Sequence, residues 1–223
     1  MVLPGHIIGV DESGKGDFFG PLVVAGLLAG EADLPFFDEL GVRDSKCLSD
    51  RRCVALDERL RARYPHQLVV LMPVEYNHRY DQLRNLNILL AECHARVIST
   101  LVELTRTNKQ KVDLAVSDKF GKAERLDTAL AKVDCRLPVR QMVRGEVVPQ
   151  VAAASILARA EFIRRMEQLS TEWSIELPKG ASSQVDEIGR RLVSKHGAEI
   201  LTQLSKKHFK NYRRAMSGDL FGK

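Results

Sequence analysis

Two adjacent carboxylates, Asp11 and Glu12, follow a short apolar segment and precede a glycine-rich turn. The segment 6–10 is β-branched and apolar, as is typical of a buried strand. Neighbouring strand side chains point to opposite faces, so both carboxylates face one site only if the strand bends here. Gly14 and Gly16 allow such a bend. A carboxylate pair in this position indicates a hard cation such as Mg²⁺, which binds carboxylate and phosphate oxygens.

The turn after the carboxylates predicts a binding site for an anion. Backbone N–H groups at Gly14 and Gly16 approach a phosphate closely, and Lys15 adds positive charge. Residues 9–15 also match the start of a nucleotide-binding P-loop, but Gly16 stands where Ser or Thr must bind magnesium. We therefore exclude a P-loop nucleoside triphosphatase. An exposed acidic turn without a function stays open as the alternative for an isolated carboxylate pair.

The charge balance gives a weak indication of a polyanionic partner. The chain has 34 Lys and Arg against 29 Asp and Glu, which gives a net charge of +5 over 223 residues. The distribution is more informative, because bases greatly outnumber acids between Arg190 and Lys223. A solvated basic tail and a patch for a phosphate backbone both fit this pattern.

The composition predicts one globular domain, because no Pro/Gly/Ser-rich linker or low-complexity run divides the chain. We expect this domain to span residues 1–223, with a helical, basic C-terminal part from about residue 184. The four cysteines form no C-x-x-C pair, so neither zinc nor a disulfide framework is indicated, and a reducing cytoplasm fits best. No uncharged stretch approaches the ~20 apolar residues that span a bilayer.

Periodicity predicts an α/β protein built around a mixed sheet. Asp118 follows one predicted strand, and Glu146 precedes a predicted alanine-rich helix. His94 is interpreted as an ordinary residue of a helix face and is left out of the site. Further strands are predicted at 22–28, 68–72 and 112–116, and helices at 50–60, 86–101, 123–133, 151–169, 185–192 and 198–204.

A site containing Asp11, Glu12, Asp118 and Glu146 would place four negative charges close together. Such carboxylates raise one another's pKa unless cations neutralise them. The arrangement is therefore typical of a cage for two magnesium ions about 3.5 to 4 Å apart, which catalyses phosphodiester hydrolysis.

Further motifs occur in a fixed order along the chain and together resemble the type 2 ribonucleases H. The lysine between Gly14 and Gly16 resembles ribonuclease HIII, since ribonuclease HII usually has arginine there. The resemblance covers nearly the full length. Its motifs are Asp11–Asp17, Phe19–Leu22, Asp44–Lys46, Leu48-Ser49, Tyr76-Asn77, Leu86-Asn87, Leu89–Ala91, His94-Ala95, Ala152–Arg159, Leu177–Ser182 and Lys207–Asn211.

The resemblance implies an RNase H-like fold and an endonuclease that hydrolyses the RNA strand of RNA/DNA hybrids, leaving 5′-phosphate and 3′-hydroxyl ends. It implies two Mg²⁺ or Mn²⁺ ions as cofactors. We expect a cytoplasmic monomer without an obligatory protein partner or a membrane association. The implied catalytic and metal-binding residues are Asp11, Glu12, Asp118 and Glu146, with Asp11 bridging the ions. The implied substrate-binding residues are Ser13, Gly14, Lys15, Gly16, Lys46, Ser155 and Lys179, among which Gly14–Gly16 sense a ribose 2′-hydroxyl.

Two departures from the family pattern qualify this interpretation. Ribonucleases HIII usually carry an additional N-terminal substrate-binding domain, whereas Asp11 lies near the start of this sequence. We therefore expect either that the basic C-terminal region holds the hybrid or that the chain is a shortened form. Val147–Pro149 replaces a lysine-bearing stretch after Glu146, so Glu161 is the alternative fourth carboxylate.

Three other functions are weighed against this one. A ribonuclease HII-like enzyme that cuts at single embedded ribonucleotides has the same carboxylates. A DNA-directed nuclease shares the fold class, but the Gly14–Gly16 loop argues against it. A hybrid-binding module without activity is disfavoured because acidic residues near phosphates are unfavourable without metals.

Overall fold

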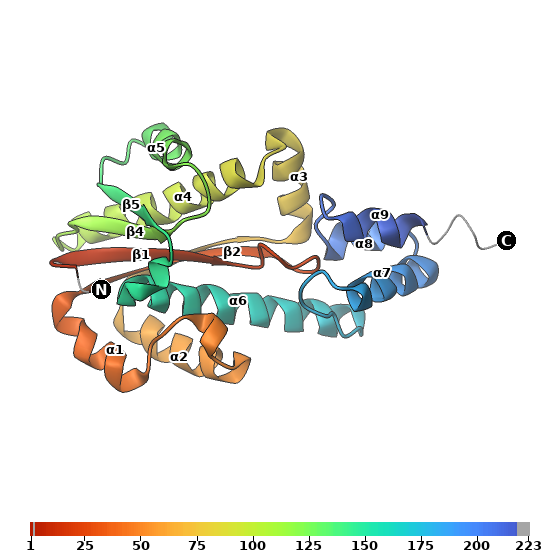
Figure 1. Ribbon diagram of the computed structural model, residues 1–223, viewed down its shortest axis with the longest axis horizontal. Helices are drawn as coiled ribbons and strands as arrows, with labels where there is room; N and C mark the ends of the chain where they lie inside the picture. Colours follow the sequence, from red (N-terminus) through yellow and green to blue (C-terminus); the bar gives the residue numbers. More distant parts are fainter. Residues whose placement is uncertain (2, 218–223) are drawn as a thin grey trace. The chain divides into compact units, whose positions relative to one another are not determined.

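The computed structural model describes residues 1 and 3–217 (Figure 1). Contacts within the chain define two compact units. The prediction of a single domain over residues 1–223 stays a prediction. The first unit comprises Met1–Ser13, Val23–Val69 and Asn85–Glu161, and the second comprises Gly14–Leu22, Val70–Arg84 and Phe162–Lys223.

A five-stranded mixed sheet has the strand order β3-β2-β1-β4-β5. β1 pairs antiparallel with β2 and parallel with β4, and β4 pairs parallel with β5. The predicted hairpin of the first two strands and the predicted mixed sheet are thereby confirmed. The strands are β1 (His6–Ser13), β2 (Leu22–Gly30), β3 (His66–Leu71), β4 (Leu114–Asp118) and β5 (Val139–Met142).

Helices cover both faces of this sheet. In Figure 1, α4 and α5 lie on one face, whereas α1, α2 and α6 lie on the other. Every residue of β2 is buried, as its continuously apolar sequence predicts. These helices are α1 (Leu34–Leu40), α2 (Asp50–Arg63), α4 (Leu86–Thr107), α5 (Ala123–Lys132) and α6 (Pro149–Trp173), the last of which contributes residues to both units.

Local sequence signals account for the two helices that position the site. Ser49 caps α2, since its Oγ accepts a hydrogen bond from Arg52 N at 3.2 Å. The apolar stripe of α4 is buried, including Leu90, Val97 and Leu101, whereas Arg96 lies exposed between them.

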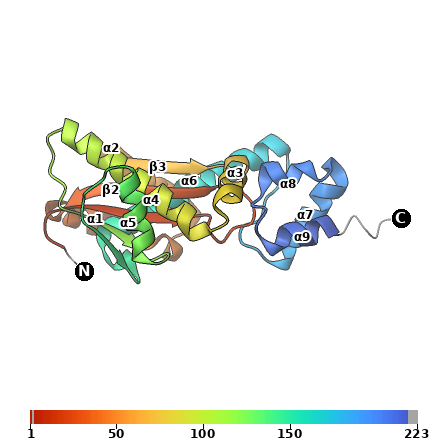
Figure 2. The ribbon, with the colours of Figure 1, turned by 90° about the horizontal axis from the view of Figure 1, so that it is seen from above.

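The second unit contains α3 (Pro73–Leu83), α7 (Ser183–His196), α8 (Glu199–Leu204) and α9 (Lys210–Ser217). α7 contacts both α8 and α9, and α8 also contacts α3 (Figure 2). Asp186 on α7 accepts a 2.6 Å hydrogen bond from Asn211 Nδ2 and forms a 3.2 Å ion pair with Arg214, which ties α9 to α7. This part is helical and basic, as expected from about residue 184, although Lys223 lies outside the described residues.

Within residues 1 and 3–217, we find no helix that combines the length and the apolar character required to cross a membrane.

Candidate active site

The two adjacent carboxylates lie within β1 rather than after it. The antiparallel pairing with β2 continues through both residues, with Asp11 opposite Ala25 and Glu12 opposite Val24. β1 therefore extends to Ser13, further than the sequence predicted. Because side chains alternate along a strand, the two carboxylates leave β1 toward different faces of the sheet.

Glu12 faces α4, where it meets a buried histidine. His94 Nε2 lies 3.3 Å from Glu12 Oε2, and the other ring nitrogen lies 3.1 Å from Ser117 Oγ. The hydroxyl of Ser117 in turn donates to the carbonyl of Asp118 at 2.8 Å. His94 thus connects two of the candidate carboxylate positions. Sequence reasoning misses this role because an apolar helix stripe does not reveal which strand residue lies opposite it.

Asp118 lies beside Asp11 because β1 and β4 run in parallel. Val10 pairs with Ser117, so the next residue of each strand is a candidate carboxylate at the same end of the sheet. Asp118 Oδ1 also accepts a 2.9 Å hydrogen bond from Gly145 N. A Cβ atom at Gly145 would lie 2.8 Å from the Cα of Asp118, so only glycine allows this approach. The contact brings Glu146, the next residue, close to Asp118.

The pKa shifts indicate that these carboxylates act on one another. Burial raises the pKa of Asp11 well above its usual value, and the charges of Glu12 and Asp118 raise it further. Burial opposes protonation of Lys46, but Asp44, Asp11, Asp118 and Glu146 together raise its pKa above 10.5. Lys46 therefore lies within electrostatic reach of three of the four candidate carboxylates.

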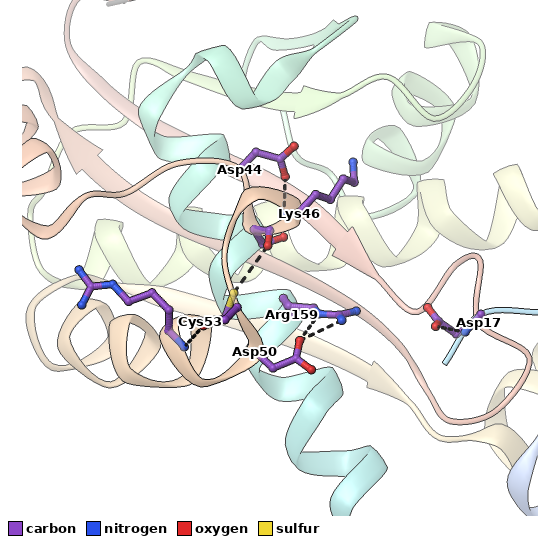
Figure 3. Close-up of polar contacts among 10 residues, drawn as sticks. Asp17, Asp44, Lys46, Asp50, Cys53 and Arg159 are labelled. Atoms are coloured by element: carbon purple, nitrogen blue, oxygen red, sulfur yellow. Dashed lines mark hydrogen bonds and ion pairs between the residues drawn. The ribbon is translucent and has the colours of Figure 1, made fainter. Parts of the chain in front are cut away.

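A set of polar contacts fixes the loop that carries Lys46. Asp44 Oδ1 accepts a hydrogen bond from Lys46 N at 3.0 Å, and Ser155 Oγ accepts one from Ser45 N at 3.1 Å. Figure 3 shows Lys46 and Asp44 extending from this loop. It also shows Arg159 of α6 bound to Asp50 of α2, at 3.0 and 3.2 Å.

Ser155 is 2% exposed, and its hydroxyl also donates to Ala152 O at 2.8 Å. In this structure it therefore supports the Lys46 loop. Its predicted contact with substrate stays a prediction.

The chemistry of the four carboxylates fits Mg²⁺ or Mn²⁺, which prefer oxygen ligands. Burial is the main cause of the raised pKa of Asp11, and the neighbouring charges of Glu12 and Asp118 add to it. A divalent cation at this position would favour the ionised form of Asp11. As the side chains stand, no three His, Cys, Asp or Glu residues within the described part of the chain are arranged to hold a metal ion. Glu12 lies against His94 on the α4 face of the sheet, so it would have to turn toward Asp11 and Asp118 to share an ion with them.

The alternative fourth carboxylate, Glu161, has a different environment from Glu146. Its Oε2 lies 3.2 Å from Arg61 Nη2, and Arg61 Nε also donates to the fully buried Asp57 at 2.8 Å. Glu146, in contrast, contributes with Asp11 and Asp118 to the raised pKa of Lys46. Glu146 therefore acts electrostatically on the same lysine as Asp11 and Asp118, whereas Glu161 belongs to an ion-pair network between α2 and α6. The assignment of Glu146 as the fourth carboxylate stays a prediction.

The predicted substrate loop belongs to the second unit, where a buried lysine holds it. Gly14 has φ of +85°, which favours glycine, and a Cβ there would lie 2.1 Å from the carbonyl oxygen of Pro21. Lys206 is fully buried, and its Nζ donates to the carbonyls of Asp17 at 2.8 Å and Gly20 at 2.7 Å. These bonds fix the chain directly after the predicted loop.

The segment that carries Lys179 is attached to the same turn. Gly180 N donates to Asp17 Oδ1 at 2.7 Å, and Phe18 N donates to Gly180 O at 2.9 Å. Asp17 is labelled in Figure 3. Lys179 and the Gly14–Gly16 loop are thus parts of one hydrogen-bonded structure. Of the predicted substrate-binding residues, Gly14, Lys15, Gly16 and Lys179 belong to the second unit, whereas Ser13, Lys46, Ser155 and all four carboxylates belong to the first.

The buried lysine predicts a pH-dependent stability. Burial lowers the pKa of Lys206 to about 7, with Asp17 opposing the shift. Between pH 7 and 10.5 the folded state holds neutral lysine while the unfolded state holds the charged form. The unfolded state then binds more protons, so this residue makes stability rise with pH. We expect the free energy of unfolding of the wild type, relative to Lys206→Met, to increase by on the order of 1 kcal/mol per pH unit from pH 7 to 9.

Urea unfolding at pH 7, 8 and 9 measures this difference. Lys207→Met is the matched control, because its side chain is exposed. We expect no comparable pH trend for it. If the difference in free energy of unfolding between the wild type and Lys206→Met were constant from pH 7 to 9, a neutral buried lysine would be contradicted.

Comparison with known proteins places most of the chain in one family. A family model described as Ribonuclease HII matches residues 8–212. The chain is 42% identical to Ribonuclease HIII of Chlamydia felis, covering 92% of this chain and 68% of that protein. It is 35% identical to Ribonuclease HIII of Staphylococcus epidermidis, covering 95% and 68% respectively.

A solved structure agrees with these matches. Bst-RNase HIII in complex with Mn²⁺ superposes with a TM-score of 0.88 at 33% identity, covering 95% of this chain and 69% of that chain. The predicted RNase H-like fold is thereby confirmed. With a family match across most of its length and relatives named Ribonuclease HIII, the chain belongs to the ribonuclease HII family and is a ribonuclease H endonuclease.

Proposed function

We propose that this enzyme hydrolyses the RNA strand of RNA/DNA hybrids with two divalent metal ions and leaves 5′-phosphate and 3′-hydroxyl ends. One observation carries the proposal: Asp11, Asp118 and Glu146, from three separate segments, all raise the pKa of Lys46. A converging set of carboxylates beside one lysine suits a site that binds both metal ions and phosphate.

In this proposal Asp11, Glu12, Asp118 and Glu146 hold Mg²⁺ or Mn²⁺. The relative named Bst-RNase HIII was solved in complex with Mn²⁺, which supports a divalent ion here. When bound, two such ions would lower the pKa of the attacking water and would neutralise charge at the phosphorus centre. Lys46 orients the phosphate next to the carboxylates.

Recognition of RNA is assigned to the turn after β1. Backbone groups of Gly14–Gly16 bind the 2′-hydroxyl, the group that distinguishes RNA from DNA at a given position. Ser13, Lys15, Ser155 and Lys179 complete the proposed substrate contacts. The bonds from Lys206 to Asp17 and Gly20 support this assignment, because a loop that discriminates by its backbone must keep a fixed conformation.

Affinity for the duplex is assigned partly to α7 and α9. A groove of about 590 Å³ lies between these helices, and the described residues that line it are four cationic side chains and one serine. Such a surface binds a phosphate backbone without reading sequence. Its lining residues are Arg190, Lys210, Arg213, Arg214 and Ser217.

The proposal also includes a cytoplasmic enzyme that acts as a monomer without an obligatory protein partner. Its four cysteines, Cys47, Cys53, Cys93 and Cys135, are all free thiols, which suits a reducing compartment.

The substrate is tested with end-labelled duplexes that contain either four consecutive ribonucleotides or one, each with Mg²⁺ or Mn²⁺. We expect efficient cleavage of the longer tract, with at least about tenfold slower cleavage at the single ribonucleotide, corresponding to about 1.4 kcal/mol in the barrier. Equal rates at both would instead assign a ribonuclease HII-like specificity. Metal-independent binding of the hybrid without any cleavage would support a binding module and contradict the proposal.

A further inference from the structure

A groove on the first unit contains three cationic residues and does not coincide with any predicted substrate contact. It has a volume of about 880 Å³ and lies at the N-terminal end of α5. Lys119, Lys122 and Arg125 line it, against one acidic residue, Glu124. Lys119 and Lys122 are exposed, so their charges are available to a ligand. The remaining lining residues are Asn87, Gly121, Ala123 and Gln141.

Gln141 supplies a second, independent indication of a ligand. It lies on β5, where it pairs with Ser117 of β4. Both polar atoms of its side chain are buried, and neither has a hydrogen-bond partner within the described residues. Buried amides are nearly always hydrogen-bonded in folded proteins. Gln141 lines the groove, so a small turn of its side chain toward the groove would let a bound polar group complete its hydrogen bonding.

The groove is also built to favour an anion. In the amide orientation that satisfies its neighbours, Asn87 accepts from Arg125 Nη1 at 3.1 Å and donates to Phe120 O at 2.9 Å, which holds the guanidinium in place. The N-cap residue of α5, Lys122, makes no side-chain capping bond. The first backbone N–H groups of this helix, at the positive end of the helix dipole, can therefore donate to a bound anion.

The position of the groove relates it to the reaction. Lys119 directly follows Asp118, and Gln141 precedes Met142, which pairs with Asp118 across the sheet. We propose that this groove binds a backbone phosphate of the nucleic acid, separate from the phosphate that is cleaved. The proposal rests on the proposed hybrid substrate and adds a contact for its backbone. It assigns Lys119, Lys122, Arg125 and Gln141 to binding and not to the chemical step.

The charge contribution is tested with the double variant Lys119→Gln/Lys122→Gln on a hybrid substrate. We expect KM to rise about fivefold, with kcat unchanged within about twofold. The slope of log(kcat/KM) against log salt should become less negative by about 1, the effect of one lost phosphate contact. The matched control is Arg106→Gln/Lys109→Gln, which removes two exposed charges from the same unit and should leave KM and the slope unchanged.

The amide contribution is tested with Gln141→Leu. Because the variant removes buried polar atoms without partners, we expect a higher melting temperature than the wild type. We also expect KM to rise about threefold while the salt slope stays the same, since no charge is lost. A merely structural glutamine would not combine higher stability with weaker substrate binding.

The proposal is overturned if the double variant keeps the wild-type KM and salt slope, or if its kcat falls while KM is unchanged. It is also overturned if the control Arg106→Gln/Lys109→Gln shows the same rise in KM and the same change in salt slope. Fluorescence anisotropy with a labelled hybrid, in the absence of metal, measures the same contacts without turnover. A wild type that binds hybrid through this groove but cleaves nothing would refute the proposed function alone. Cleavage with unaltered binding by the variants would refute the groove alone.

Discussion

Asp11→Asn is expected to abolish hybrid cleavage, lowering kcat by at least about a thousandfold, or about 4 kcal/mol in the barrier. The amide keeps the size of the side chain but cannot supply the negative charge that a bridging metal ligand requires. Asp11 is buried next to two other candidate ligands, since burial raises its pKa and the charges of Glu12 and Asp118 raise it further. We expect hybrid binding to stay within about threefold, because backbone phosphate contacts supply most of the affinity.

The same substitution is expected to stabilise the metal-free protein. A raised pKa in the folded state means that folding disfavours the ionised form of Asp11. The resulting loss of stability grows as pH rises above the usual value of 3.8 and is complete once pH exceeds the pKa of the folded state. At neutral pH the free energy of unfolding of the wild type is therefore lowered by the buried charge of Asp11, whereas that of Asp11→Asn is not.

Thermal unfolding in EDTA and in Mg²⁺ measures both effects together. We expect Asp11→Asn to melt above the wild type in EDTA and to gain less stability from Mg²⁺. Asp38→Asn, on the separate helix α1, is the control and should match the wild type in cleavage. A variant that melts lower than the wild type in EDTA, or that still cleaves hybrid at a comparable rate, would contradict the assignment of Asp11.

The elements with strong periodic or capping signals were predictable from the sequence. α4 follows from the spacing of its leucines, and the start of α2 follows from Ser49 as N-cap. β2 follows from its unbroken apolar run. In each case the signal lies within the element itself: helical spacing of apolar residues, an N-cap residue, or an unbroken apolar run in a strand covered on both faces.

Elements that depend on long-range contacts were not predicted. β5 has only four residues, Val139–Met142, none of them fully buried, and it forms by pairing with β4 at the edge of the sheet. α3 and α9 carry many polar residues and are held by bonds such as Asn77 Nδ2 to Ser205 O and Asn211 Nδ2 to Asp186. Those partners are distant in sequence, so no local sequence pattern predicts these contacts.

The proximity of the carboxylates has the same long-range origin. Asp118 lies beside Asp11 because two strands pair in parallel, and Gly145, the residue before Glu146, donates a hydrogen bond to Asp118. The family motifs identify these positions without explaining why they meet. The motifs also do not reveal the contact of His94 with Glu12 or the bond from Lys206 to Asp17, since both depend on the folded arrangement.

Glu146→Gln is expected to lower kcat about a hundredfold to a thousandfold, or about 3 to 4 kcal/mol in the barrier, with little change in KM. The reason is that Glu146 belongs to the group of carboxylates that acts on Lys46, together with Asp11 and Asp118. Removing its charge weakens metal binding at the site but leaves the surfaces that bind the duplex intact. Raising the Mg²⁺ or Mn²⁺ concentration should therefore restore part of the activity.

Glu161→Gln is the matched comparison, because it makes the same chemical change at the alternative position. Glu161 pairs with Arg61, which also holds the buried Asp57, so its loss should lower the free energy of unfolding by about 1 kcal/mol. We expect its kcat to stay within about twofold of the wild type and its response to metal concentration to be unchanged. If the two variants exchanged these behaviours, with Glu161→Gln inactive and rescued by metal, the fourth ligand would be Glu161. The contact between Gly145 and Asp118 would then serve only to join β4 to the start of α6.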